Sequence, residues 1–205
     1  ERVHARFAGT ALFDFGSVPE GYCWVFPKRA RLSVGVLTTR RGHTDLEHRL
    51  RDYLNRAGVV EIEHVERHGY VIPLRPVARP FVRNRTLVVG DAAGLADPVT
   101  AEGISAAALS GGLAARAVVE SGGDEVRARR AYGRALAREL LPELRVTRLH
   151  CRILYGMPRL RALFFRRSGR HLAAAIADVM AGARSYHETL GGRLPALRLL
   201  RYAIR

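Results

Sequence analysis

The residues best suited to chemistry lie in the stretch VVGDAAGLADPVTAEGI, from Val88 to Ile104. It runs from apolar residues through a Gly-Asp turn, small residues and an Asp-Pro step into the start of a helix. Asp91 offers a carboxylate that can accept two hydroxyl hydrogen bonds from a sugar alcohol. Gly90 lets a ligand approach the backbone closely, because it carries no side chain. The alternative is that Asp91 only caps a turn that any α/β protein needs.

The residues after the turn favour an anionic ligand. Residues 92–94 are small and leave space, and Pro98 stiffens the loop that follows. A helix that begins within 102–104 directs its first amide groups at whatever lies in front of it, and these groups favour negative charge. The combination suits a flavin, with Asp91 on the ribityl chain and the helix amides toward the pyrophosphate and the anionic edge of the reduced ring.

A second pattern, GYCWVFP over residues 21–27, has aromatic residues at every second position. Alternate side chains of a strand face the same side of a sheet, so Tyr22, Trp24 and Phe26 share one face. Cys23 points to the other face, which argues against a catalytic thiol. Core packing is the usual role of such an aromatic face. The alternative is the wall of an apolar cavity, since large apolar pockets are the usual ligand sites.

The two stretches together resemble a known family. Gly-Asp-Ala-Ala-Gly followed by Asp-Pro-x-Thr-x-Glu-Gly-Ile resembles the second flavin-binding motif of the p-hydroxybenzoate-hydroxylase-like FAD oxidoreductases. Within them the chain is most similar to the geranylgeranyl reductase family, whose Tyr-x-Trp-x-Phe-Pro signature matches residues 21–27. RLSVGV at 31–36, Gly69-x-x-Ile72-Pro73 and the Ala183–Tyr186 segment match as well, so the resemblance spans nearly the whole chain.

The resemblance implies an FAD-dependent reductase that saturates isolated double bonds of a prenyl chain on a lipid, quinone or pigment precursor. It assigns flavin binding to Gly90, Asp91, Ala92, Pro98, Gly103 and Ile104. It assigns the substrate cavity to Tyr22, Trp24, Phe26 and Pro27. It nominates no catalytic proton donor, and NAD(P)H and ferredoxin both remain open as electron donors. The alternatives are a flavin-dependent monooxygenase or halogenase of the same fold, and a non-catalytic lipid- or partner-binding fragment.

Two departures from the family pattern stand out. Ala101 occupies a position where the family usually has glycine, so a positive φ there would strain the backbone. No G-x-G-x-x-G follows a strand, although the family carries one near its N-terminus for the ADP half of FAD. We therefore expect this chain to be the C-terminal portion of a longer enzyme, with an incomplete FAD site of its own.

The pattern of elements predicts a mixed α+β or α/β fold. We expect a β-rich substrate-binding region over 1–85, whose sheet is of the p-hydroxybenzoate-hydroxylase type and begins with the opening segment. Residues 86–122 form the strand–turn–helix of the FAD domain, and 123–205 form a helical C-terminal region, with the N-terminal Rossmann βαβ unit absent. Helices are predicted over 45–57, ended by Gly58, over 103–120, and from 124 to about 155, broken near Pro142.

Composition restricts the partners. The net charge is +15, but Lys28 is the single lysine among 34 basic residues, a skew typical of GC-rich coding. No basic run or RNA-type motif accompanies the charge, which argues against nucleic acid. The segment LRALFFRR, 160–167, fits either helix packing with arginine stems over apolar surface or a helix seated on anionic lipid. We expect a cytoplasmic protein, with peripheral membrane contact left open.

The cysteines and histidines predict no metal centre. Cys23 and Cys151 are far apart without framework spacing, so free thiols are expected. His64 and His68 share one face of an expected strand but lack a third ligand. Five other histidines are scattered and are expected at the surface or at helix ends: His43, His48, His150, His171 and His187.

Overall fold

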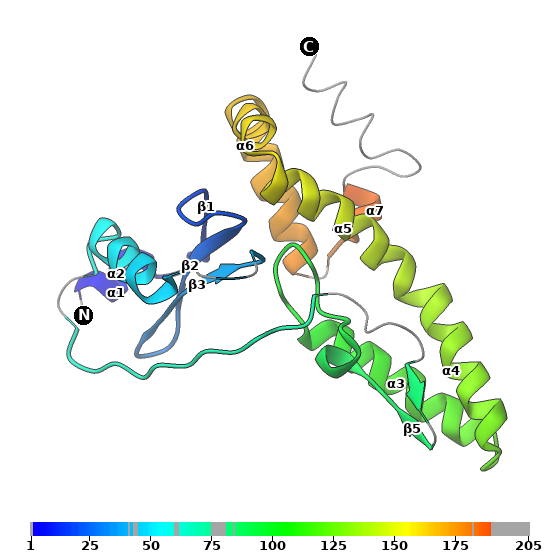
Figure 1. The fold of residues 1–205 in the computed structure, drawn as a ribbon. Coiled ribbons are helices and arrows are strands. Elements are labelled where there is room, and N and C mark those ends of the chain that lie inside the picture. The colour runs from blue at the N-terminus through cyan, green and yellow to red at the C-terminus, as the bar shows by residue number, and fades with distance from the viewer. Residues whose placement is uncertain are drawn as a thin grey trace. The chain divides into compact units, whose positions relative to one another are not determined.

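The computed structural model describes residues 2–40, 42, 45–59, 62–74, 81–83, 85–181 and 183–189. The chain divides into two compact units, residues 1–69 and residues 70–205, which are considered separately (Figure 1). His43 lies outside the described residues.

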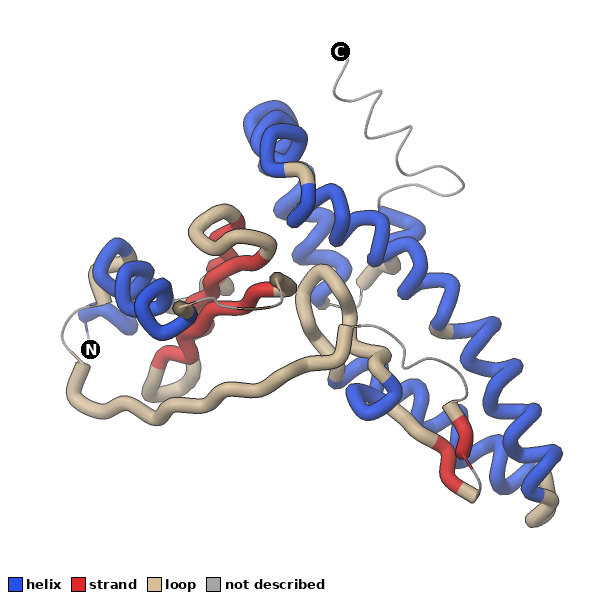
Figure 2. The backbone as a smooth tube through the Cα atoms, in the orientation of Figure 1, coloured by secondary structure: helices blue, strands red, loops and turns tan. Residues whose placement is uncertain are grey.

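The first unit is a small antiparallel sheet with helices. Its elements are α1 (Arg2–Phe7), β1 (Leu12–Phe15), β2 (Gly21–Pro27), β3 (Leu32–Thr38) and α2 (Leu46–Arg56). The three strands lie side by side in the order β1-β2-β3 (Figure 2). Phe13 lies opposite Trp24, and Trp24 lies opposite Gly35. The predicted strand is wrong for residues 2–7, which form α1. Its last residue, Phe7, is buried in the core of this unit.

The core of the first unit lies on one face of the sheet. Cys23 and Val25 of β2 are completely buried there, together with Phe7, Val18 and Tyr53. The helix predicted over 45–57 is confirmed as α2: Asp45 caps it by accepting the amide of His48 at 3.1 Å, and Gly58 follows with a φ of +67°.

The second unit is mainly helical. Its elements are β4 (Val82–Arg83), β5 (Thr86–Leu87), the 3₁₀ turn η1 (Gly90–Ala93), α3 (Ile104–Glu120), α4 (Glu125–Glu139), α5 (Leu141–Gly156), α6 (Pro158–Met180) and α7 (Tyr186–Thr189). The strand that opens the expected strand–turn–helix unit, TLVVG over 86–90, is shorter than the sequence predicts. Only Thr86 and Leu87 pair, with β4, and Val88 and Val89 continue as half-buried loop. Residues 62–74 likewise form a loop without helix or strand (Figure 2).

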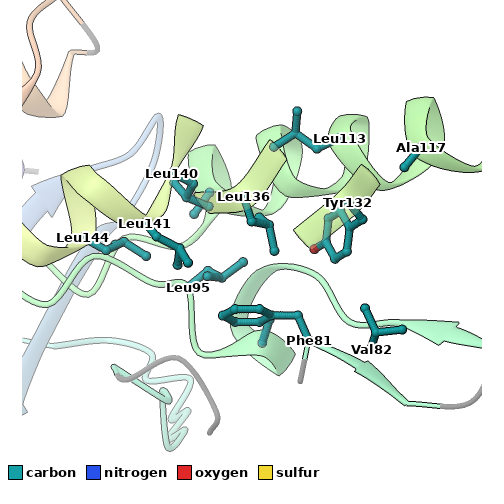
Figure 3. Packing of buried hydrophobic residues seen from close by; sticks show 12 residues of the cluster. Phe81, Val82, Leu95, Leu113, Ala117, Tyr132, Leu136, Leu140, Leu141 and Leu144 are labelled. Carbon is teal, nitrogen blue, oxygen red and sulfur yellow. The ribbon is translucent and has the colours of Figure 1, made fainter. Parts of the chain in front are cut away.

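Helices α3 and α4 pack around the turn that follows β5. Leu95, Tyr132 and Leu136 are completely buried, and Figure 3 shows them gathered with Phe81, Leu113 and neighbouring leucines. The Tyr132 hydroxyl donates a hydrogen bond of 2.7 Å to the carbonyl of Val88, which fixes the chain just before η1. The predicted break near Pro142 is confirmed, because α4 ends at Glu139 and Pro142 lies in the first turn of α5.

Helix α6 contains the arginine-rich segment. Phe164 is buried, and the guanidinium of Arg161 donates to the carbonyl of Leu154 at 3.0 Å, so part of the segment packs within its own unit. Ser168 interrupts the helical backbone of α6. Among the described residues, none of the helices combines the length and apolar content needed to cross a bilayer.

The two cysteines differ in reactivity. Both are free thiols, as expected, but Cys23 is buried and Cys151 is half-buried. Burial, reinforced by the nearby Asp14, raises the pKa of Cys23 to about 11. Because the thiolate is the reactive form, iodoacetamide in the folded protein should alkylate Cys151 well before Cys23, as followed by peptide mass spectrometry. Both should react in denaturant; rapid labelling of Cys23 in the folded protein would contradict this packing.

Candidate functional site

The Gly-Asp turn is fastened onto α3 through Gly90. The amide of Gly90 donates to the Ser110 hydroxyl at 3.0 Å, and a Cβ on Gly90 would lie 2.9 Å from the side chain of Ala107. Gly90 also has a φ of +54°, which glycine adopts without strain. The chain therefore enters η1 pressed against the first turns of α3, and Asp91 follows at a fixed place.

The carboxylate of Asp91 lies over Gly103, the residue that caps α3. A Cβ built on Gly103 would fall 2.1 Å from Asp91 Oδ1, so only glycine leaves room for this carboxylate. Asp91 itself is exposed and can accept hydrogen bonds from a ligand. The turn and the start of α3 thus form a cradle, defined by Asp91 and Gly103. Any side chain at position 103 would occupy the space of the Asp91 carboxylate.

Fewer backbone amides at the start of α3 are available to a ligand than the sequence predicted. The amide of Ser105 donates to Glu102 Oε1 at 2.8 Å, so one of the first amides is already satisfied by a carboxylate of the chain itself. The helix otherwise begins at the predicted place, with Gly103 as its cap. An anion in front of α3 would share this end of the helix with Glu102.

Residues 97–103, the closing loop, are tied together by Asp97. Its Oδ1 atom accepts the amides of Val99 at 2.7 Å and Thr100 at 2.8 Å. Its backbone N–H donates to the carbonyl of Glu102, and its carbonyl accepts the amide of Ala101. Burial raises the pKa of Asp97, and the hydrogen bonds from Thr100 and Val99 oppose that rise.

Ala101 carries the strain that its sequence position predicted. Its φ is +57°, in the left-handed region where glycine is usual. Such a conformation persists only when its surroundings hold it in place, and the hydrogen bonds at both ends of the closing loop do so.

The residues assigned to flavin all lie in the second unit, but they differ in exposure. Asp91, Ala92 and Ile104 are exposed and Gly103 is half-buried, whereas Gly90 and Pro98 are buried. Gly90 and Pro98 therefore shape the backbone, and the other four offer the surface to which a ligand could bind.

The aromatic face is the side of the sheet away from the helix-packed core. Tyr22, Trp24 and Phe26 lie on it, with ring centroids 5.9 and 6.1 Å apart along the strand. Phe13 and Phe15 of β1 join them, Phe13 at 5.0 Å from Phe26. Sequence reasoning missed these two residues, although their alternation in LFDF was available as a signal. Strand alternation puts Pro27 on the opposite side, with Cys23 and Val25.

Trp24 lies flat across the neighbouring strand. A Cβ on Gly35 would come within 2.0 Å of the indole ring, and the indole N–H points to the Ser33 hydroxyl at 3.5 Å. The absence of a side chain at Gly35 therefore lets the Trp24 ring pack directly against the backbone of β3.

Two of the expectations from the sequence concern histidines. His64 and His68 are exposed and lie 4.0 and 3.9 Å from Glu66, and no group of three metal-binding side chains exists in the described part of the chain. The expectation that His150 lies at the surface or at a helix end is wrong. His150 is buried within α5, where its ring stacks on Tyr186 at 5.9 Å.

Comparison with known proteins supports the family resemblance. The chain is 38% identical over 148 residues to digeranylgeranylglycerophospholipid reductase 2 of Methanothermobacter thermautotrophicus. The chain is thus similar in sequence to a protein named as such a reductase. It is also 37% identical over 115 residues to digeranylgeranylglycerophospholipid reductase of Methanoculleus marisnigri, and 35% identical over 144 residues to an uncharacterized protein of Methanosarcina barkeri.

These matches cover 64%, 53% and 70% of the chain, respectively. They span 37%, 29% and 37% of the length of the three relatives. No family model matches the chain.

Replacing Ala101 by glycine tests the strain in the closing loop. Because φ is +57°, Ala101→Gly should raise the free energy of unfolding by about 0.5–1 kcal/mol, net of glycine's greater freedom when unfolded. Denaturant titration measures this change. Ala108→Gly, on the exposed side of α3, should instead lower stability by about 1 kcal/mol. Destabilisation by both variants would exclude strain at Ala101.

Replacing Gly35 by alanine tests the packing of Trp24 against β3. The added methyl group must displace the Trp24 ring, so Gly35→Ala should alter the fluorescence of Trp24, the single tryptophan of the chain. It should also cost about 1–3 kcal/mol of stability, as overpacking does. Gly69→Ala, where no atom lies within 4 Å, is the control. An unchanged emission spectrum in Gly35→Ala would place the indole elsewhere.

Proposed function

We propose that the chain supplies the flavin-contacting turn and the substrate wall of an FAD-dependent reductase that saturates double bonds of a geranylgeranyl-type lipid chain. The observation that carries this proposal is the exposed carboxylate of Asp91 over the bare α-carbon of Gly103. The names of the relatives support the reductase class and a lipid substrate with prenyl chains. The corresponding fold is of the p-hydroxybenzoate-hydroxylase type.

The residues fit a flavin in size and chemistry. A ribityl chain offers hydroxyl donors, and the ionised carboxylate of Asp91 is an acceptor for two of them. The small side chain of Ala92 is exposed next to it, and Gly103 removes the one side chain that would fill the cradle. The cap of α3 adds the partial positive charge of a helix start.

Each part of the site has its own task in the reaction. The bound flavin supplies the hydride chemistry. Asp91 orients the cofactor through its sugar-alcohol arm, and the start of α3 favours the negative charge that a reduced flavin carries. The carboxylate of Glu102 also lies at the start of α3, where it accepts a hydrogen bond from the amide of Ser105.

The aromatic face suits the hydrocarbon part of the substrate. Five aromatic rings lie on one side of a sheet whose other side carries the core. Transfer of each CH₂ group from water to such a surface contributes about 0.8 kcal/mol. The prenyl chain would therefore dominate substrate affinity, with the headgroup outside the aromatic face.

A lipid substrate also gives α6 a role. Arg159, Arg166 and Arg170 are exposed on this helix, and Met157 and Met180 are exposed at its ends. Arginine side chains are attracted to anionic headgroups at about 1 kcal/mol each near the surface. Peripheral contact of this helix with the membrane would bring the enzyme to its substrate.

Asp91→Asn tests the flavin contact without changing side-chain size. In the polypeptide encoded by the complete reading frame, the loss of charge should weaken FAD binding by about 10- to 100-fold. Flavin absorbance of the purified protein and titration of the stripped protein measure the change. Asp124→Asn is the matched control, because Asp124 caps α4 by accepting the amide of Arg127 at 3.0 Å. Equal FAD affinity in wild type and Asp91→Asn would refute the proposed contact.

A further inference from the structure

A largely buried cluster of polar residues connects the closing loop with α5 and α7 and has no part in the proposed chemistry. It consists of Asp97 in the loop, Glu143, His150 and Tyr155 on α5, and Tyr186 on α7. The three ring-bearing members are 4–6% exposed. These residues come from positions up to 89 apart in the sequence. Such a group is expensive to bury unless its contacts serve the structure or the site.

The cluster holds the closing loop through two tyrosine hydroxyls. Tyr186 donates to Asp97 Oδ1 at 3.3 Å, the same oxygen that accepts the amides of Val99 and Thr100. Tyr155 donates to the carbonyl of Val99. The loop is therefore attached to α5 and α7 as well as closed upon itself.

Tyr186 is itself held in place from α5. Its backbone amide donates to Glu143 Oε1, and its ring stacks on His150 with an interplanar angle of 21°. Neither ring nitrogen of His150 makes a hydrogen bond of good geometry within the described residues. Burial lowers the pKa of His150, partly offset by the carbonyl of Val146, which favours the neutral form of the ring that packs against Tyr186.

We propose that Tyr186 is a positioning residue for the cofactor. Through Asp97 it fixes the closing loop, and the loop sets where Gly103 and the start of α3 lie against Asp91. The strained φ of Ala101 agrees with this role, because a loop under strain needs an outside anchor. The inference rests on the proposed flavin contact of Asp91 and Gly103.

The hydroxyl of Tyr186 also favours the ionised form of Asp97. Burial raises the pKa of Asp97, and hydrogen bonds from Thr100, Val99 and Tyr186 oppose that rise. Removing the hydroxyl should therefore make Asp97 take up its proton at higher pH, which weakens its grip on the loop amides. Among the described residues, Glu143 and Tyr155 on α5 are further ionisable groups that act on Tyr186, and His150 stacks on its ring.

Tyr186→Phe is the direct test, since it keeps the ring on His150 and removes only the hydroxyl. Hydrogen exchange should accelerate about tenfold at the amides of Val99 and Thr100, which lose support when Asp97 loses a partner. In the polypeptide from the complete reading frame, FAD affinity should fall by a similar factor. The acid midpoint of FAD release should move to higher pH, and the release should occur at pH values where circular dichroism shows that the protein is still folded, because unfolding alone would also release the cofactor.

Tyr132→Phe is the matched control, because it removes another buried tyrosine hydroxyl, bonded to Val88 outside the closing loop. It should leave the exchange of Val99 and Thr100 unchanged. Glu143→Gln, which weakens the backbone anchor of Tyr186, should reproduce the exchange result in smaller measure if Tyr186→Phe folds poorly.

The outcomes separate the two proposals. Unchanged exchange at Val99 and Thr100 in Tyr186→Phe and Glu143→Gln would overturn the anchoring role, whatever the cofactor. Accelerated exchange with unchanged FAD affinity and acid midpoint would overturn the positioning role. A wild-type protein that binds no FAD would refute the proposed function itself, and the positioning role with it.

Discussion

The carboxylate of Asp91 and the α-carbon of Gly103 lie so close that no side chain fits between them. This close contact joins the turn after β5 to the first turn of α3. Hydrogen bonds from other parts of the second unit keep the turn in this position. Ser110 holds the Gly90 amide from within α3, and Tyr132 holds Val88 from α4. Both hydrogen bonds are made by buried hydroxyls to the backbone, which gives the turn a fixed place without using its own side chains. Asp91 is thereby left exposed for a ligand.

The position of Gly103 depends on the closing loop, residues 97–103, whose conformation costs free energy. Asp97 is a half-buried carboxylate and Ala101 has a left-handed backbone, and each costs free energy that local contacts must offset. The amides of Val99 and Thr100 and the hydroxyl of Tyr186 supply those contacts. A geometry maintained against strain is common at binding sites, where precise placement matters more than local stability.

The sequence predicted those features that depend on neighbouring residues, such as helix ends and the alternation of side chains along a strand. The cap and end of α2, the start of α3, the break at Pro142 and the shared face of Tyr22, Trp24 and Phe26 follow from spacing and residue type. One departure in a motif pointed to Ala101 as a place where a positive φ would cause strain, and the structure has a positive φ there. Features decided by tertiary contacts were missed: Phe7 ends a helix because it reaches the core, and His150 is buried by contacts with residues far along the chain. The strand predicted over 86–90 stops early because only two residues find a partner strand.

The most direct measurement is the FAD affinity of Gly103→Ala in the polypeptide encoded by the complete reading frame, determined by calorimetric titration. The added methyl group would lie 2.1 Å from Asp91 Oδ1 and must displace that carboxylate. We predict a folded protein with clearly weakened FAD binding. Gly112→Ala, on the same helix with no atom within 4 Å, should bind FAD like the wild type. Wild-type affinity in Gly103→Ala would contradict the claim that this carboxylate holds the cofactor.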